Sequence, residues 1–149
     1  MMVVHFSSTD VAEAAGMPYD TVDRWVGDGH IAPLNRVKGT GNNRYWTIPQ
    51  VVGVAMGAKL RRQSEMRCQL KIVARVFRFI ADMTRDELEE AFSEGRTHLW
   101  PFTHDLKLAP PWSGADPDEC NVQQVYHEVL AVLVPRALKR YNAKIEVTV

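Results

Sequence analysis

The chain has 149 residues with 18 basic and 18 acidic side chains, so its formal net charge is zero. A neutral total excludes a histone-like blanket of positive charge, and any nucleic-acid binding would need a local basic patch. Residues 1–64 carry seven basic and five acidic side chains, whereas residues 65–149 carry eleven and thirteen. The mild positive excess therefore lies in the N-terminal part, which is the sign that a nucleic-acid-binding part would have.

The cellular compartment is indicated by the cysteines and by the hydropathy pattern. Cys68 and Cys120 are the only cysteines, and neither belongs to a C-x-x-C pair. The opening stretch MMVVHFSS lacks a basic n-region and is too short for the apolar part of a signal peptide. No apolar run approaches the roughly 18 residues that cross a membrane. We expect a cytoplasmic protein with two reduced thiols and no membrane contact.

The first two predicted elements are short helices joined by a tight turn. Ser7 stands three residues before Asp10, which is the spacing of an N-terminal cap, and Gly16 is a natural terminator. Pro18 sets the start of the second helix. One apolar stripe with i, i+3, i+4 spacing follows, formed by Val22, Trp25 and Val26. We therefore expect Trp25 to pack on the first helix while the polar side of the second helix faces outward.

A hairpin and a third helix come next. Two β-favouring runs, 34–38 and 43–47, flank the sequence GTGN, which is a hairpin signal. Arg36 and Lys38 share one face of the first run, and Arg44 lies on the opposing strand. Thr47 and Gln50 form a capping box for a helix over residues 49–62. The side chains expected to face inward are Val51, Val52, Ala55, Met56 and Leu60.

This order of elements, helix, turn, helix, basic hairpin and helix, is that of a winged helix-turn-helix. The stretches SSTDVAEAAGMPYDTVDRWVGDGHIAP and NRYWTIPQVV resemble the DNA-binding domain of MerR-like regulators and of the related excisionase-type domains. The matching features are the DVAEAAG helix, TVDRW in the second helix, Gly29-His-Ile after it, and Arg44-Tyr45 before the third helix. The resemblance covers about residues 5–62, roughly two fifths of the chain.

The resemblance implies that the second helix enters the major groove of DNA and that the wing lies on the backbone. The DNA-binding candidates that it implies are Tyr19, Thr21, Arg24, Arg36, Lys38, Arg44 and Tyr45. Arginine binds guanine through two hydrogen bonds, and basic groups on a wing neutralise phosphates. The chain departs from the family at Asp23, where the family usually has a basic residue. We expect Asp23 to support Arg24 or Arg36 from the rim of the interface.

The C-terminal part is predicted to be a small α+β unit. A helix over residues 64–83 carries a heptad-like seam formed by Met66, Leu70, Val73, Phe77 and Ile80. Its basic stripe, formed by Arg67, Lys71, Arg75 and Arg78, either contacts flanking phosphate or is a solvated surface. Thr84 caps a helix that runs through Phe92, and Asn121 caps a helix to about Val134, where Pro135 kinks the helix or starts a new one. The alternation of residues 143–149 predicts a terminal strand, with residues 97–102 as its partner.

The C-terminal part contains side chains that can bind metal, react as thiols or line a pocket. The only cluster of metal-ligand types, His98, His104, Asp105, His127 and Glu128, matches no ligand spacing, so we expect no metal, cofactor or enzyme activity. Cys68 and Cys120 are candidates for a redox or metal-sensing pair, but the closely grouped cysteines with which sensing members of the MerR-like family hold metal are absent. Four aromatic residues form an effector pocket or a plain aromatic core: Trp100, Phe102, Trp112 and Tyr126.

The sequence therefore predicts a mainly α protein in two parts. Residues 1–63 are expected to form a winged helix-turn-helix, and residues 64–149 a small helical or α+β dimerisation or effector domain. The leading interpretation is a homodimeric, sequence-specific transcriptional regulator that binds double-stranded DNA, with a possible small-molecule or protein effector at its C-terminal part. The alternatives are an excisionase-like architectural factor and a protein-interaction adaptor that has lost DNA binding.

Overall fold

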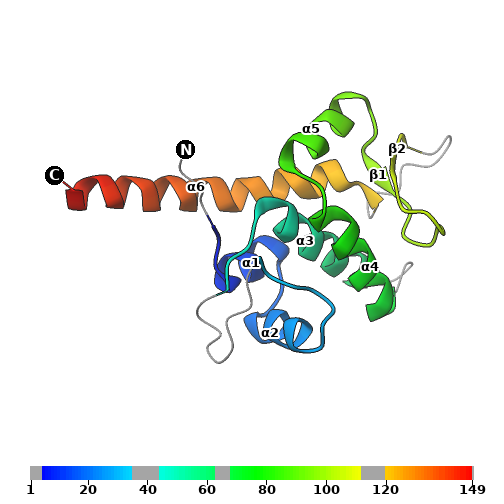
Figure 1. Ribbon diagram of the computed structural model, residues 1–149, viewed down its shortest axis with the longest axis horizontal. Coiled ribbons are helices and arrows are strands. Elements are labelled where there is room, and N and C mark those ends of the chain that lie inside the picture. Colours follow the sequence, from blue (N-terminus) through cyan, green and yellow to red (C-terminus); the bar gives the residue numbers. More distant parts are fainter. Residues whose placement is uncertain (1–4, 35–43, 63–67, 112–119, 149) are drawn as a thin grey trace.

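The computed structural model describes residues 5–34, 44–62, 68–111 and 120–148, with side chains described as far as residue 140. These residues form a mainly helical protein with a single two-stranded sheet (Figure 1). In chain order the elements are α1 (Ser8–Ala15), α2 (Tyr19–Gly27), α3 (Ile48–Arg62), α4 (Leu70–Ala81), α5 (Arg85–Ser93), β1 (His98–Leu99), β2 (Leu108–Ala109) and α6 (Val122–Thr148). The prediction of a mainly α fold is confirmed.

The helices α1 and α2 form as their local signals predict. The Ser7 hydroxyl accepts the Asp10 N–H at 3.2 Å, and the Asp10 carboxylate accepts the Ser7 N–H at 2.9 Å. Gly16 ends α1 at φ +65°, a left-handed conformation that favours glycine. Trp25 is buried together with the rest of the stripe in α2, and α1 contacts α2. The prediction that Trp25 belongs to the core is confirmed.

The segments on either side of the predicted wing lie together. Leu34 donates its N–H to the Tyr45 carbonyl at 2.7 Å, and Phe6 pairs with Trp46 in an antiparallel bridge. Trp46 is fully buried, and its indole N–H donates to the Ser8 hydroxyl at 3.1 Å. The hairpin tip, residues 35–43, lies outside the described residues. The two ends of the predicted wing are therefore held beside α1.

Helix α3 is the central element of the fold. Its predicted capping box is present, because Thr47 accepts the Gln50 N–H at 3.3 Å and Gln50 accepts the Thr47 N–H at 2.9 Å. Buried residues lie on nearly every side of α3, which packs against α1, α4 and α6. Gly53 and Gly57 allow α4 to approach closely: a Cβ added at Gly57 would lie 2.7 Å from Cγ1 of Val73. A Cβ at Gly53 would lie 3.1 Å from the Phe77 carbonyl oxygen.

Substituting Gly57 by alanine is expected to destabilise the protein by about 1–3 kcal/mol, because α3 and α4 must separate to accept the new methyl group. Chemical denaturation of the purified variant measures this loss. Gly27→Ala is the control, since a Cβ there meets nothing within 4 Å. The control should be neutral or stabilised by at most about 1 kcal/mol, the helix propensity gained over glycine. Equal stability of Gly57→Ala and the parent would contradict this close packing.

Helix α4 begins later than the sequence predicts and uses its apolar seam within the chain. The helix spans Leu70–Ala81 instead of residues 64–83, and Gln69 before it is extended with ψ 156°. Residues 63–67, including Met66 of the seam, lie outside the described residues. Val73, Phe77 and Ile80 are buried in the core, and α4 packs on α3. The seam is therefore covered by α3 and does not offer a free surface to a second chain.

The strands are shorter and paired differently from the prediction. Thr84 and Glu87 form the predicted capping box of α5. β1 covers only two residues of the predicted strand 97–102, and it pairs antiparallel with β2. On its other side His98 forms an isolated bridge to Asn121. Both edges of β1 are thus occupied by nearby chain.

The predicted terminal strand over residues 143–149 is wrong, because α6 continues as one helix to Thr148. Asn121 caps α6 as predicted, accepting the Gln124 N–H at 3.0 Å, but the helix does not end near Val134. Pro135 lies inside it on the exposed side, where the carbonyl of Ala131 that loses its partner can bind water. Extending an existing helix requires no new nucleus, whereas a strand requires a free edge, and β1 offers none.

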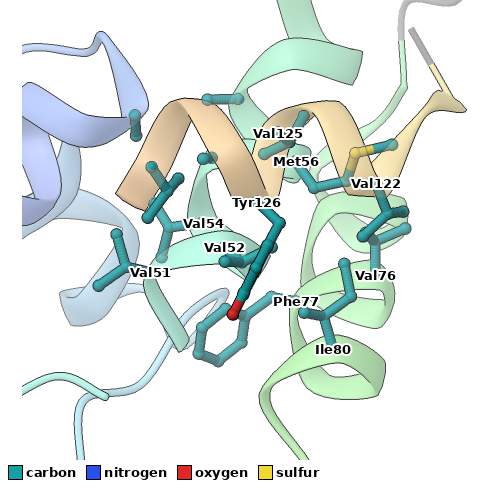
Figure 2. Close-up of a cluster of buried hydrophobic side chains, with 14 of the residues drawn as sticks. Val51, Val52, Val54, Met56, Val76, Phe77, Ile80, Val122, Val125 and Tyr126 are labelled. Atoms are coloured by element: carbon teal, nitrogen blue, oxygen red, sulfur yellow. The ribbon is translucent and has the colours of Figure 1, made fainter. Parts of the chain in front are cut away.

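The hydrophobic core is one cluster that reaches from α1 and α2 to α5, and a large part of it lies between α3, α4 and α6. Figure 2 shows side chains of these three helices meeting, among them Val52, Met56, Phe77, Val125 and Tyr126. The core is continuous across residue 63, where the sequence predicts a domain boundary, and the separate folding of the two parts stays a prediction. In the part of the chain that is described, no helix is both long and apolar enough to cross a membrane.

Candidate nucleic-acid interface

The outer face of α2 carries three of the predicted DNA-binding side chains. Tyr19 is 38% exposed, Thr21 is half-buried and Arg24 is exposed. The orientation of Arg24 follows from the apolar stripe: because Val22, Trp25 and Val26 face the core, Arg24, which lies between Val22 and Trp25 in the sequence, faces solvent, whereas Tyr19 and Thr21 lie at the two margins of the stripe. Arg24 has no side-chain hydrogen bond or ion pair within the described residues, so its guanidinium is available to a ligand.

Arg44 is placed beside α2 by an ion pair with Asp23. Its Nη1 lies 2.6 Å from Oδ1 of Asp23, and only 18% of the Arg44 side chain is exposed. The expectation that Asp23 supports Arg24 or Arg36 is wrong for Arg24, and Arg36 lies outside the described residues. The pair fixes the C-terminal end of the predicted wing to α2. It also neutralises one of the two acidic side chains, Asp20 and Asp23, that flank Thr21 and Arg24.

Tyr45 adds an aromatic group next to this pair. Its side chain is 45% exposed, and its ring contacts the His5 ring with centroids 5.6 Å apart. The two remaining predicted site residues, Arg36 and Lys38, lie outside the described residues. The structure thus brings the α2 face and the Arg44-Tyr45 segment together.

Such a surface matches the chemistry of DNA recognition. A guanidinium donates two parallel hydrogen bonds to the major-groove edge of guanine, and hydroxyl groups bond bases or phosphates. The exposed α2 face presents Arg24 with the hydroxyl-bearing Tyr19 and Thr21. The acidic groups on the same helix limit non-specific attraction to phosphate, so affinity from this face would depend on specific contacts.

The basic stripe of α4 is partly engaged within the chain. Lys71 and Arg78 are exposed, whereas the half-buried Arg75 donates a hydrogen bond to the His104 carbonyl. This bond ties α4 to the loop between β1 and β2. Arg75 is therefore a structural residue, and only Lys71 and Arg78 of the described stripe remain as solvated cations.

The aromatic residues considered for an effector pocket do not form one group. Trp100 and Phe102 contact each other with centroids 5.5 Å apart. Tyr126 instead contacts Phe92, accepts a hydrogen bond from Nε of Arg85 at 2.9 Å and donates one to Glu89 at 2.6 Å. Burial and the hydrogen bond to Glu89 raise the pKa of Tyr126. Trp112 lies outside the described residues, and an effector stays a prediction.

The other groups with chemical potential are held in structural settings. Cys68 and Cys120 are both buried and are not joined in a disulfide. Burial raises the pKa of the Cys68 thiol, against a smaller opposing effect of Arg61, so the reactive thiolate is disfavoured. Among the described residues, no three His, Cys, Asp or Glu side chains are grouped so that they could hold a metal ion.

Sequence reasoning missed an ionic cluster that joins the two ends of the chain. Asp10, identified from the sequence only as a capping residue, also binds Arg136 and Arg140 of α6. These arginines follow Asp10 by 126 and 130 residues, so no local spacing relates them to it. The only sequence signal was an acidic residue on a helix face that is otherwise buried.

Comparisons with known proteins identified no relative: no protein-family model, no curated protein and no solved structure matched this chain.

Proposed function

We propose that this protein is a sequence-specific DNA-binding transcriptional regulator that acts as a homodimer. The observation that carries the proposal is the exposed surface of α2, where Arg24 projects without a protein partner among the described residues, one turn from Thr21 and on the same helix as the exposed Tyr19. The proposed DNA-binding unit consists of α1, the turn after it and α2, together with a wing between Leu34 and Arg44. The MerR-like resemblance of residues 5–62 supports the same assignment.

The positions of the side chains suggest two roles. Arg24 lies on the exposed face of α2, where it would meet the floor of a major groove. Arg36 and Lys38 belong to the predicted wing, which would run along the sugar-phosphate wall. Arg44, which is bound to Asp23, would hold the wing on the reading helix and add charge near the same phosphates.

Alanine at Arg24 is expected to weaken binding to the preferred site by about 1–3 kcal/mol and to relax base preference at one position. Alanine at Lys38 should weaken all sequences about equally and flatten the salt dependence by about one unit of slope. Titration of both variants against specific and scrambled duplexes at several salt concentrations measures both effects. Lys107→Ala, an exposed lysine of the β1–β2 loop, is the matched control for loss of one positive charge.

Other outcomes would favour the alternatives. Unchanged binding in both variants would favour a protein-interaction adaptor. If Arg24→Ala weakened all sequences equally and Lys38→Ala changed base preference, the wing would contact the bases and α2 the DNA backbone. A footprint over direct repeats, in place of an inverted repeat, would favour an excisionase-like architectural factor.

The dimer interface is proposed on the outer half of α6. Neither the seam of α4 nor the predicted terminal strand offers a surface for a second chain, since α3 covers the seam and residues 143–148 are helical. In contrast, α6 extends beyond the other elements (Figure 1), and on it Val134 and Leu138 are 41% and 58% exposed. Apolar side chains on a projecting helix are typical of a surface that pairs with another helix.

Leu138→Glu is expected to convert a dimer into a monomer, because two buried carboxylates would face each other at the proposed interface. Sedimentation equilibrium at tens of micromolar measures the mass of the parent and of the variant. Lys139→Glu, at the next position on the same helix, controls for added negative charge. A monomeric parent would contradict the homodimer, and a dimeric Leu138→Glu variant would place the interface elsewhere.

A further inference from the structure

The ionic cluster between α1 and α6 is centred on one buried carboxylate. Only 2% of the Asp10 side chain is exposed, and each of its oxygens is bound to an arginine. Nη1 of Arg136 lies 2.7 Å from Oδ1, and Nη2 of Arg140 lies 2.7 Å from Oδ2. Arg136 also forms an ion pair with the exposed Glu13. Such charge-assisted bonds fix both distance and direction between the helices.

The cluster lies where the apolar attachment of α6 ends. Among the residues of α6 whose side chains are described, which end at Arg140, the last buried one is Leu133, and Arg136 and Arg140 follow in the next two turns. Beyond Leu133 the described large apolar side chains, Val134 and Leu138, are exposed. Among the described residues beyond Leu133, α6 is therefore held to the rest of the protein by the bonds of Arg136 and Arg140 to Asp10 and by the partly buried Ala137.

The position of α1 in turn determines the position of α2. The two helices contact each other, and Arg62 of α3 donates to the carbonyls of Ala15 and Gly16 at the end of α1, at 3.1 and 2.9 Å. Val22 and Trp25 are buried in the same core as α1. A fixed angle between α6 and α1 therefore fixes the angle between α6 and the exposed face of α2.

We propose that Asp10 is a positioning residue that clamps the outer half of α6 to α1. In the proposed dimer it thereby sets the distance on DNA between the α2 faces of the two subunits. This inference rests on the proposed function and its dimer. In a dimer joined through α6, a rigid clamp permits one spacing of half-sites, whereas a loose clamp tolerates several. The cluster thus contributes specificity without touching DNA.

The charges suggest which substitutions isolate this role. Burial alone would raise the pKa of Asp10, but the Ser7 hydrogen bond and the bonds from Arg140 and Arg136 outweigh it and hold the pKa below its usual value. Asp10→Asn removes the charge and keeps an oxygen that can accept the Ser7 N–H. Arg136→Gln with Arg140→Gln removes the partners from the other side. Glu13→Gln is the matched control, since it removes only the exposed ion pair.

The test has one arm without DNA and one with it. Spin labels on Lys71→Cys and Lys139→Cys, both exposed positions, report the distance between α4 and the outer half of α6. The native cysteines do not compete for label because both are buried. In protein diluted with unlabelled chains we expect one narrow distance for the parent and for Glu13→Gln. A broad distribution is expected for Asp10→Asn and for the double arginine variant.

In the second arm, duplexes carry one half-site or two inverted half-sites whose separation changes one base pair at a time. We expect Asp10→Asn to bind a single half-site as tightly as the parent does. The ratio of affinities for the preferred and the other half-site separations should fall about fivefold or more in this variant. A narrow distance in both variants would overturn the clamp. A broad distance with an unchanged separation preference would overturn its positioning role, as would a parent without any such preference.

Two further outcomes are a variant that does not fold and a parent that does not bind DNA. If Asp10→Asn does not fold, Arg140→Gln alone, which leaves Arg136 on the carboxylate, takes its place in both arms. A parent that binds no duplex overturns the proposed function and with it the role on DNA. The distance measurement then separately decides whether the clamp exists.

Discussion

Trp25→Ala is expected to lower the free energy of unfolding by about 3–5 kcal/mol, the range for deleting a large aromatic side chain from a core. Trp25 is 5% exposed and belongs to the same buried cluster as Val11, Ala12 and Ala15 of α1. The substitution leaves a cavity between α1 and α2 that the two short helices can close only by shifting. Denaturant titration followed by circular dichroism measures the loss.

The control for Trp25 is its exposed neighbour on the same helix. Arg24→Ala should unfold like the parent, because Arg24 is exposed and its side chain makes no hydrogen bond or ion pair among the described residues. Together the two variants test the orientation of α2. If Trp25→Ala melts like the parent and only a binding function is lost, the tryptophan faces outward and the proposed reading face is wrong.

Trp46→Ala should be as destabilising, by about 3–5 kcal/mol. Trp46 is 0% exposed, pairs with Phe6 through the backbone, and donates its indole N–H to the buried Ser8 hydroxyl at 3.1 Å. Loss of this side chain also removes the packing that holds the end of the predicted wing beside α1. Thermal or denaturant unfolding of the purified variant is the measurement.

A smaller substitution separates the hydrogen bond of Trp46 from its volume. Trp46→Phe retains most of the apolar ring but leaves the Ser8 hydroxyl without its donor, which costs about 1–3 kcal/mol when a buried group is left unpaired. Adding Ser8→Ala removes the unpaired hydroxyl and should recover part of that loss. If the double variant is no more stable than Trp46→Phe, the hydrogen bond contributes nothing and packing accounts for the whole effect.

Part of the candidate site could be predicted because helical periodicity decides it. Once Trp25 is assigned to the core, the 3.6-residue period places Arg24 outward on α2. The ion pair between Arg44 and Asp23 could not be predicted, since the partners are 21 residues apart and meet only when residues 44–46 fold back beside α2. The resemblance identified Asp23 as unusual but did not identify its partner.

The sequence by itself determined the local features of this protein. The capping boxes at Ser7, Thr47 and Thr84 and the cap at Asn121 formed as expected, because each requires only bonds between residues three apart.

The tertiary structure decided the rest. Residues 143–148 alternate like a strand but remain helical, because the edges of β1 are occupied and an existing helix extends at little cost. The seam of α4 is buried against α3, because Gly53 and Gly57 carry no Cβ and let the two helices approach closely. Asp10 has its charge partners on α6 because the core between α3 and α6 brings two helices from opposite ends of the chain within bonding distance, which no local pattern encodes.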